Sequence, residues 1–382
     1  MTSRVITSSA ELGRRIQDAR EDASISQSAL AERIGIDRTA IVRLEAGERK
    51  VSATELASIA DVLDRPIDWF VVESPLAVVS RRRDPTVGGF SRRLDVALEQ
   101  CARDIAFLLE RGALRPSLRP ASSPVPSSYD DAERLADWAR SKFNLGAGPL
   151  LNLQSVAEKM GLYAFSLDLG DDAGDAAYAE VDSVGVAVIN GATDAFRRRF
   201  SLAHEIGHHL VGDLYEKSPR VEGEQSHPRP GEEFDIERIL NAFAASLLIP
   251  RSDAVTLWNQ SQSLSVRKAA LHLATRFCVS WSVACNRLRD LQLIDTETRR
   301  RLIESGITRG DILELGENWS AELEPPSLPP QYLLDVLAAY RAQRLSAPRT
   351  VSLLHRLLEE VDLPFIDEPP IELLRREFPA LA

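Results

Sequence analysis

Cysteine and long apolar runs are scarce in this chain, and each scarcity excludes a class of protein. Only three of the 382 residues are cysteine, Cys101, Cys278 and Cys285, and they form no C-x-x-C pair, which excludes a disulfide framework. No stretch approaches the roughly 18 consecutive apolar residues of a membrane span. The stretch Met1 to Arg15 has no apolar signal-peptide core, so we expect a cytoplasmic protein with no membrane partner.

Positive charge is also in short supply, because the formal net charge is -11. This balance excludes a protein that coats nucleic acid along its whole surface, but it allows one local DNA-reading element. Hydrophobic residues make up 44% and charged residues 27%, as is ordinary for globular proteins. A chain of this length predicts two or three domains.

Histidine is rare as well, yet two of the six histidines lie in one short segment, His204-Glu205-Ile206-Gly207-His208. Apolar residues recur around it at helical spacing, which predicts one half-buried helix with His204 and His208 on the same face. Two such imidazoles can hold one zinc ion, and Glu205 can take a proton from a metal-bound water. The alternative is a pair of surface histidines on an ordinary amphipathic helix.

A catalytic zinc site needs a third protein ligand, and a second predicted helix over residues 233–250 offers one. Glu237 and Asn241 are four residues apart on it, so a Glu-bound metal could have amide support one turn on. Three other acidic residues are close enough in sequence to compete: Glu232, Glu233 and Asp235. An acidic first turn that answers the helix dipole is the alternative for all four carboxylates.

The run from Arg199 to His208, followed by Glu237-x-x-x-Asn241-x-Phe-Ala-Ala and ending in Leu-Leu-Ile-Pro250, resembles the ImmA/IrrE family of bacterial zinc metallopeptidases. The resemblance implies that residues 129–296 form an α+β, zincin-like metallopeptidase domain. It implies the metal ligands His204, His208 and Glu237, with Glu205 as the catalytic base. The implied cofactor is Zn2+, with Mn2+ as an alternative.

The sequence between the predicted helices of this domain predicts a β-hairpin, residues 177–181 and 185–189. An edge strand beside a zinc site can bind an extended peptide by strand addition, which suits a protease. Three residues are candidates to stabilise an oxyanion, although each is more often a plain structural residue: Tyr178, Tyr215 and His227.

Residues 1–72 carry four helical segments with Ser26 and Ser52 as predicted caps and Gly35 at a tight turn. Their motifs, Ser26-Gln27-x-x-Leu-Ala and Ile-x-x-Leu-Glu-x-Gly47-x-Arg, resemble the Xre family, whose helix-turn-helix is all-α and lambda-repressor-like. The resemblance implies that duplex DNA, an operator, is the partner. Its implied DNA contacts are Gln27 on a phosphate and three readers at the third helix: Arg38, Thr39 and Arg43.

The charge of this first domain is unfavourable for DNA binding. Residues 1–72 hold 10 Lys and Arg against 12 Asp and Glu, which is poor for phosphate affinity. The alternative is a helical bundle used only for protein contact.

Residues 73–128 are predicted to form a basic helix and a Pro/Ser-rich linker, because residues 81–119 hold 9 Arg against 5 acidic residues and four prolines follow. The arginines either supply the missing positive charge or form a solvated face. The apolar stripe of this helix is predicted to pack on the bundle or to pair two chains as a homodimer. Residues 297–382 are predicted to be a helical C-terminal interaction region.

Together these patterns predict a DNA-binding transcriptional regulator with a zinc-dependent endopeptidase domain. By the resemblance, its protein substrate is a transcriptional repressor that is cut in a response to stress or foreign DNA. The alternative is a transcription regulator whose metal site is a sensor or a relic without proteolysis. Glu205 distinguishes the two, because metal binding needs only the ligands whereas hydrolysis needs the base.

Overall fold

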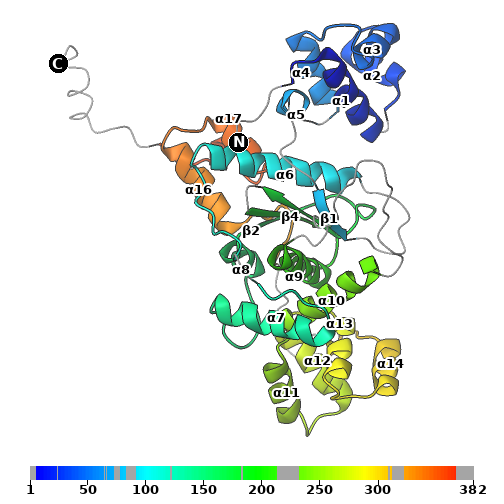
Figure 1. Ribbon diagram of the computed structural model, residues 1–382, viewed down its shortest axis with the longest axis vertical. Helices are drawn as coiled ribbons and strands as arrows, with labels where there is room; N and C mark the ends of the chain where they lie inside the picture. The colour runs from blue at the N-terminus through cyan, green and yellow to red at the C-terminus, as the bar shows by residue number, and fades with distance from the viewer. Residues whose placement is uncertain are drawn as a thin grey trace, which may run out of the picture.

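The computed structural model places a small helical bundle at one end of the chain and a larger unit around a four-stranded sheet (Figure 1). It describes residues 6–23, 25–63, 65, 67–72, 78–82, 92–120, 123–181, 184–212, 232–308, 310–311 and 322–366. The expected fold class is confirmed: a helix-turn-helix bundle, then an α+β unit, then a helical C-terminal part.

The N-terminal bundle has five helices: α1 (Ser9–Asp22), α2 (Gln27–Ile34), α3 (Arg38–Glu45), α4 (Ala53–Val62) and α5 (Ile67–Val71). Both predicted caps form, since Ser26 accepts a hydrogen bond from the backbone N–H of Ala29 and Ser52 forms a capping box with Glu55. Gly35 ends α2 with a φ of 72°, a conformation that favours glycine.

The sheet consists of β1 (Val78–Arg82), β2 (Leu162–Leu167), β3 (Ala176–Val181) and β4 (Val184–Asn190), in the order β1-β3-β4-β2. β3 and β4 are antiparallel, so the predicted hairpin is confirmed. However, β1 pairs along the outer edge of β3, and β2 pairs in parallel with β4. The expectation that this hairpin offers a free edge to a peptide is therefore wrong, because both of its strands are interior.

Side chains on β2, β3 and β4 alternate between two separate cores. One face packs on α8 (Leu153–Lys159) and α9 (Ala195–Val211), and it consists of Leu162, Ala164, Ala176, Tyr178, Ala187 and Ile189. The other face packs on α6 (Arg92–Glu110), α16 (Pro330–Arg341) and α17 (Ala347–Leu353), and it includes Tyr163, Phe165, Ala177, Ala179, Val186 and Val188. The sheet is thus the middle layer of three (Figure 1).

The apolar stripe of α6 has a different partner from the one expected. Leu98, Cys101 and Ile105 are fully buried against the sheet, not against the helix-turn-helix bundle or a second chain. Two contacts join the bundle to the outer side of α6: the Trp69 indole donates to Glu99 Oε2 at 3.0 Å, and Arg103 donates to the Val72 carbonyl at 3.1 Å.

The segment predicted as a linker also lies against the larger unit. Arg119 pairs with Glu180 at 2.6 Å, and the Ser123 hydroxyl donates to the carbonyl of Leu210 at the end of α9. In the described residues this stretch therefore runs along the protein surface and does not behave as a free tether.

Among the described residues, six further helices lie below α9: α7 (Tyr129–Lys142), α10 (Glu232–Leu248), α11 (Arg251–Gln260), α12 (Val266–Arg276), α13 (Trp281–Asp290) and α14 (Thr296–Ser305). Buried Arg140 on α7 ties this helix to α10 and to the loop that follows α7, by donating to the carbonyls of Leu247, Gly146 and Gly148. Among the described residues, no helix is long and apolar enough to cross a membrane.

A mostly buried histidine on the opposite side of the sheet is expected to make stability depend on pH. His355 follows α17, and its Nε2 lies 3.7 Å from Cys101 Sγ and 3.8 Å from Asp104 Oδ2. Burial, followed by the Arg349 guanidinium, lowers the pKa of His355 to about 4. The folded chain therefore keeps this imidazole neutral at a pH where the unfolded chain protonates it.

We expect the protein to lose less stability on acidification when His355 is replaced by glutamine (His355→Gln). Between the unfolded pKa of about 6.5 and the folded value, the unfolded chain binds more protons, so the free energy of unfolding falls as the pH falls. From about pH 7 to about pH 5, this decline should be smaller in the variant by about 1–2 kcal/mol. Urea denaturation at the two pH values measures it, with His272→Gln on α12 as the control. Equal declines in wild type and His355→Gln would contradict the assignment.

Candidate metal centre and DNA-facing surface

The candidate metal centre lies on α9, a helix that is buried for most of its length. Asp194 begins it by accepting hydrogen bonds from the backbone N–H groups of Phe196 and Arg197, at 3.0 and 3.1 Å. The helix then runs beneath the sheet and carries the H-E-x-x-H segment through its C-terminal half (Figure 1).

Three side chains from two helices converge on one point. His204 Nε2 and His208 Nε2 are 3.1 Å apart, and each faces one oxygen of Glu237 on α10, at 3.1 and 3.3 Å. The three donor atoms all lie within 4.8 Å of one another, and among the described residues no other cluster has this arrangement. Two imidazoles and one carboxylate match the donor set of a catalytic zinc site.

The charge of Glu237 suits this role. Burial alone would raise its pKa, but hydrogen bonds with His204 and His208 lower the pKa of Glu237 well below its usual value. The carboxylate is therefore ionised at any working pH. Both histidines are buried, whereas the Glu237 side chain is 34% exposed. Solvent therefore reaches the cluster from the side of this carboxylate.

Glu205 is buried on α9 next to His204, with 0% exposure. A carboxylate at this depth is positioned by the helix itself and not by a loop. This is the residue predicted as the catalytic base.

A glycine lets the two metal-bearing helices come close. A Cβ on Gly207 would lie 2.8 Å from Phe243 Cδ1 and 3.2 Å from Leu240 Cδ2, which is too close for any larger residue. Leu240 and Phe243 fill the space over Gly207 and are almost fully buried. This close packing brings Glu237, one turn earlier on α10, within reach of the histidines.

The next histidine, His209, fixes the rotation of α9. Its Nδ1 lies 3.0 Å from the Tyr178 hydroxyl on β3, and its Nε2 lies 2.9 Å from the Met160 carbonyl. Burial lowers the pKa of His209 to about 4, so the ring is neutral. A Cβ on Gly185 would lie 2.5 Å from His209 Nδ1, which explains the glycine on β4. Because His209 faces the sheet, His204 and His208 face α10.

Sequence reasoning missed this support for the metal helix. Histidine next to a metal motif gives no signal of its own, and only the opposing Gly185 shows that the ring fits against a strand. Tyr178, a candidate for the oxyanion, is 1% exposed and serves His209 instead. The other two candidates, Tyr215 and His227, lie outside the described residues.

The arginines that precede the H-E-x-x-H segment also help to hold α9 in place. Arg199 is buried in the core, where it pairs with Glu322 and donates to the carbonyls of Leu150 and Cys278. Arg197 pairs with Asp175 at 2.8 Å. These contacts hold the first turns of α9 against segments from distant parts of the chain.

Asn241 lies one turn beyond Glu237, and its buried Oδ1 has no hydrogen-bond partner among the described residues. An ionised carboxylate accepts from the amide nitrogen and not from Oδ1, so the amide support of Glu237 stays a prediction. The Asn241 side chain lines a cavity beside the metal cluster. The three competing acidic residues, Glu232, Glu233 and Asp235, lie in the part of α10 whose side chains are outside the description.

The helix-turn-helix bundle presents one side of α3. Arg38, Thr39 and Arg43 are all exposed on it, as required of residues that reach a base edge. Val42 is exposed between them, at 40%, and sequence reasoning missed it. A valine at this place can contact a thymine methyl group.

Gln27 is half-buried and is tied to the bundle interior. It donates to Glu45 Oε2 at 2.7 Å, and Glu45 forms a buried pair with Arg20 at 2.5 Å. The hydrogen bond from Gln27 to Glu45 fixes the start of α2 relative to α3, and the Arg20–Glu45 pair joins α1 to α3. The role of Gln27 as a phosphate contact stays a prediction.

Of the nine arginines that were expected to add positive charge, three pair with carboxylates of the protein, and the side chains of Arg81, Arg82, Arg83 and Arg92 lie outside the description. Arg103 pairs with Glu99, Arg119 pairs with Glu180, and Arg93 pairs with Asp172. Only part of the charge counted in residues 81–119 is thus available to a phosphate backbone.

Comparison with known protein families matches two separate parts of the chain. Residues 16–70 match the helix-turn-helix family, and residues 157–289 match the family described as the IrrE N-terminal-like domain, a peptidase family. The first range contains α2 and α3, and the second contains all three converging donors and Glu205. Each domain is thus of the kind that its motifs resemble.

One curated relative is an uncharacterized transcriptional regulator in the ATPase CF(0) region of Rhodospirillum rubrum, 38% identical over 61 residues. The match covers 16% of this chain and 56% of that protein.

Two of the solved structures that resemble this chain show how distant the likeness is. Bacillus thuringiensis PlcR in complex with the peptide PapR7 and DNA is 15% identical, with 80% of this chain and 96% of that one covered and a TM-score of 0.17. ComR from Streptococcus suis is 11% identical, with 92% and 94% covered and a TM-score of 0.16. Likeness at this level carries no argument about fold or function.

Proposed function

We propose that this chain, which joins a helix-turn-helix domain to an IrrE N-terminal-like domain, is a DNA-binding transcriptional regulator that also cleaves proteins. The observation that carries the proteolytic half is the convergence of His204, His208 and Glu237 beside a buried Glu205. The substrate we propose is a repressor-like regulatory protein, cut in a response to stress or foreign DNA.

The roles of the residues follow from their chemistry. His204, His208 and Glu237 would hold the metal, which we propose to be Zn2+, with Mn2+ as the alternative. Such an ion supplies Lewis acidity and lowers the pKa of a bound water to about 7. Glu205 accepts a proton from the attacking water and then returns it to the amine that leaves. His209 and Gly185 hold the helix in the rotation that this proton transfer needs.

Metal content tests the site without any substrate. The purified full-length protein is expected to hold about one divalent ion per chain, and His204→Ala is expected to lose it, because two remaining donors bind metal weakly. Elemental analysis after dialysis measures the content. The matched control is His272→Ala on α12, which removes a histidine outside the cluster. Equal metal in His204→Ala and wild type would rule out this centre.

DNA recognition is tested on α3. We expect the full-length protein to select one duplex sequence from a random pool, and Arg38→Ala or Arg43→Ala to relax the preference at single positions by about 1–3 kcal/mol. Arg14→Ala, an exposed arginine on α1, removes the same charge and should leave the selected sequence unchanged. If wild type selects no sequence, the bundle serves protein contact instead.

A further inference from the structure

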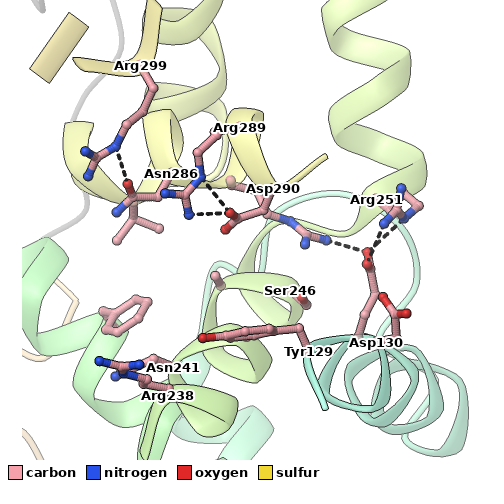
Figure 2. Close-up of a pocket in the computed structure, with 16 residues that line it drawn as sticks. Tyr129, Asp130, Arg238, Asn241, Ser246, Arg251, Asn286, Arg289, Asp290 and Arg299 are labelled. Atoms are coloured by element: carbon pink, nitrogen blue, oxygen red, sulfur yellow. Dashed lines mark hydrogen bonds and ion pairs between the residues drawn. The ribbon is translucent and has the colours of Figure 1, made fainter. Parts of the chain in front are cut away.

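The proposed mechanism does not use a cavity that lies beside the metal cluster. It has a volume of about 590 Å³ and lies between α7, α10, α11, α13 and α14 (Figure 2). Phe200 on its wall lies one helical turn before His204, and Asn241 lies one turn after Glu237. One turn is about 5.4 Å, so the cavity begins next to the metal ligands.

Arginine dominates the charged lining of this cavity. Five guanidinium groups and three carboxylates line it, which leaves two positive charges in excess in a chain whose net charge is -11. The arginines are Arg238, Arg251, Arg287, Arg289 and Arg299. Each presents a planar fork of donors that fits a carboxylate.

Two of the three carboxylates that line the cavity are already paired. Glu133 accepts from Arg251 at 2.8 Å and from Arg287 at 2.7 Å. Asp290 accepts from Arg289 (Figure 2). Arg299 differs, because its hydrogen bond at 2.8 Å goes to the neutral amide oxygen of Asn286. Among the described residues, the guanidinium of Arg299 is therefore hydrogen-bonded to a neutral group and not to one of the acids that line the cavity.

Asn241 contributes a hydrogen-bond acceptor to the cavity wall, whereas the arginines contribute donors. Its Oδ1 is buried on the cavity wall with no hydrogen-bond partner among the described residues, and a buried acceptor of this kind is usually satisfied. A ligand that supplies both an N–H donor and carboxylates would satisfy the wall at Asn241 and Arg299. A polypeptide with acidic side chains has both groups, whereas a phosphate backbone brings no N–H donor.

We propose that this cavity binds an acidic segment of the protein substrate and so sets where the chain is cut. The proposal rests on the proposed peptidase function, because the cavity adjoins the candidate metal centre. Bound there, the acidic segment would place the peptide bond about one helical turn away at the cluster. Cleavage would then favour sites with Glu or Asp a few residues to one side.

Binding is measured without cleavage, using full-length Glu205→Gln protein. The probe is a short fluorescein-labelled peptide of alternating Glu and Gly, compared with the matched peptide of Gln and Gly, and the readout is fluorescence anisotropy. The acidic peptide should bind at least about tenfold more tightly at low salt, with an advantage that shrinks as salt rises. Equal affinity for the two peptides would overturn the proposal.

Arginine variants test whether the acidic peptide binds in the cavity. Arg299→Gln and Arg238→Gln should each weaken the acidic peptide by about threefold to tenfold. The matched control is Arg300→Gln, the neighbouring arginine on α14, which pairs with Glu297 and Glu304 and does not line the cavity. If Arg300→Gln weakens binding as much as Arg299→Gln, the effect is general charge, and the cavity is not the site.

Failure of the cavity and failure of the peptidase give different results. Peptide binding that depends on Arg299, in a protein that cleaves nothing, would keep the acidic-peptide site and reject proteolysis. Cleavage of a peptide library with no enrichment of acidic residues near the cut would keep proteolysis and reject the site. Single-stranded DNA that displaces the acidic peptide through Arg299 and Arg238, and binds more tightly than it, would assign the cavity to nucleic acid and overturn the proposal.

Discussion

Glu205→Gln is expected to lower peptide-bond hydrolysis by about 10²- to 10⁴-fold, the usual contribution of a general base. Glutamine keeps the size of the buried side chain but cannot accept the proton of the attacking water. His204, His208 and Glu237 are unchanged, so metal content and the thermal unfolding temperature should stay as in wild type. A peptide library made by digesting a cell lysate, read by mass spectrometry, measures cleavage without a known substrate.

The control for this experiment is Glu304→Gln. The Glu304 side chain lies on α14, is 61% exposed and is far in sequence from the H-E-x-x-H segment. It should cut like wild type. Cleavage by Glu205→Gln at the wild-type rate would remove Glu205 from the mechanism. If wild type holds metal, cuts nothing and still regulates its genes, the metal site acts as a sensor, and proteolysis is not the output.

The second large effect is on folding. A fragment of residues 129–296, the domain that the motifs delimit, is expected to be insoluble or to lack cooperative unfolding. It would lack α6, α16 and α17, and so would expose a whole face of the sheet, including Tyr163, Phe165 and Val186. Contiguous apolar surface of this kind drives aggregation. Soluble yield and thermal unfolding of the purified fragment measure the effect.

A fragment of residues 78–366 is the matched control, because it keeps β1 and all three covering helices. It is expected to unfold cooperatively at nearly the temperature of the same unit in the full chain. A soluble 129–296 fragment with that same unfolding temperature would show that the three helices are dispensable covers.

Local patterns predicted the elements well. The spacing of apolar residues predicted the helix of His204 and His208, and the acidic start and Pro250 predicted the helix of Glu237. The caps Ser26 and Ser52 and the turn at Gly35 formed as expected. These features depend on neighbours within a few residues, so the sequence itself contains the relevant interactions.

The packing of these elements against one another was harder to predict, for a physical reason. The amphipathic pattern of α6 shows which of its faces is apolar, but an apolar face packs equally well on a helix bundle, a second chain or a sheet. Likewise, no local signal shows that β1 pairs with β3, nearly a hundred residues later, or that Gly185 makes room for His209. In the metal centre, the two histidines follow from one helix, whereas the geometry of Glu237 depends on the packing of α10 over Gly207.

The pairing of β1 with β3 also limits how such a protein can arise by recombination. A crossover after residue 72 exchanges the DNA-reading domain and leaves β1 with the sheet that it completes. A crossover a few residues before α6 would carry β1 away with the old domain and leave the backbone groups of β3 open to another chain. We therefore expect shuffling of regulators with this architecture to be tolerated at the first junction and selected against at the second.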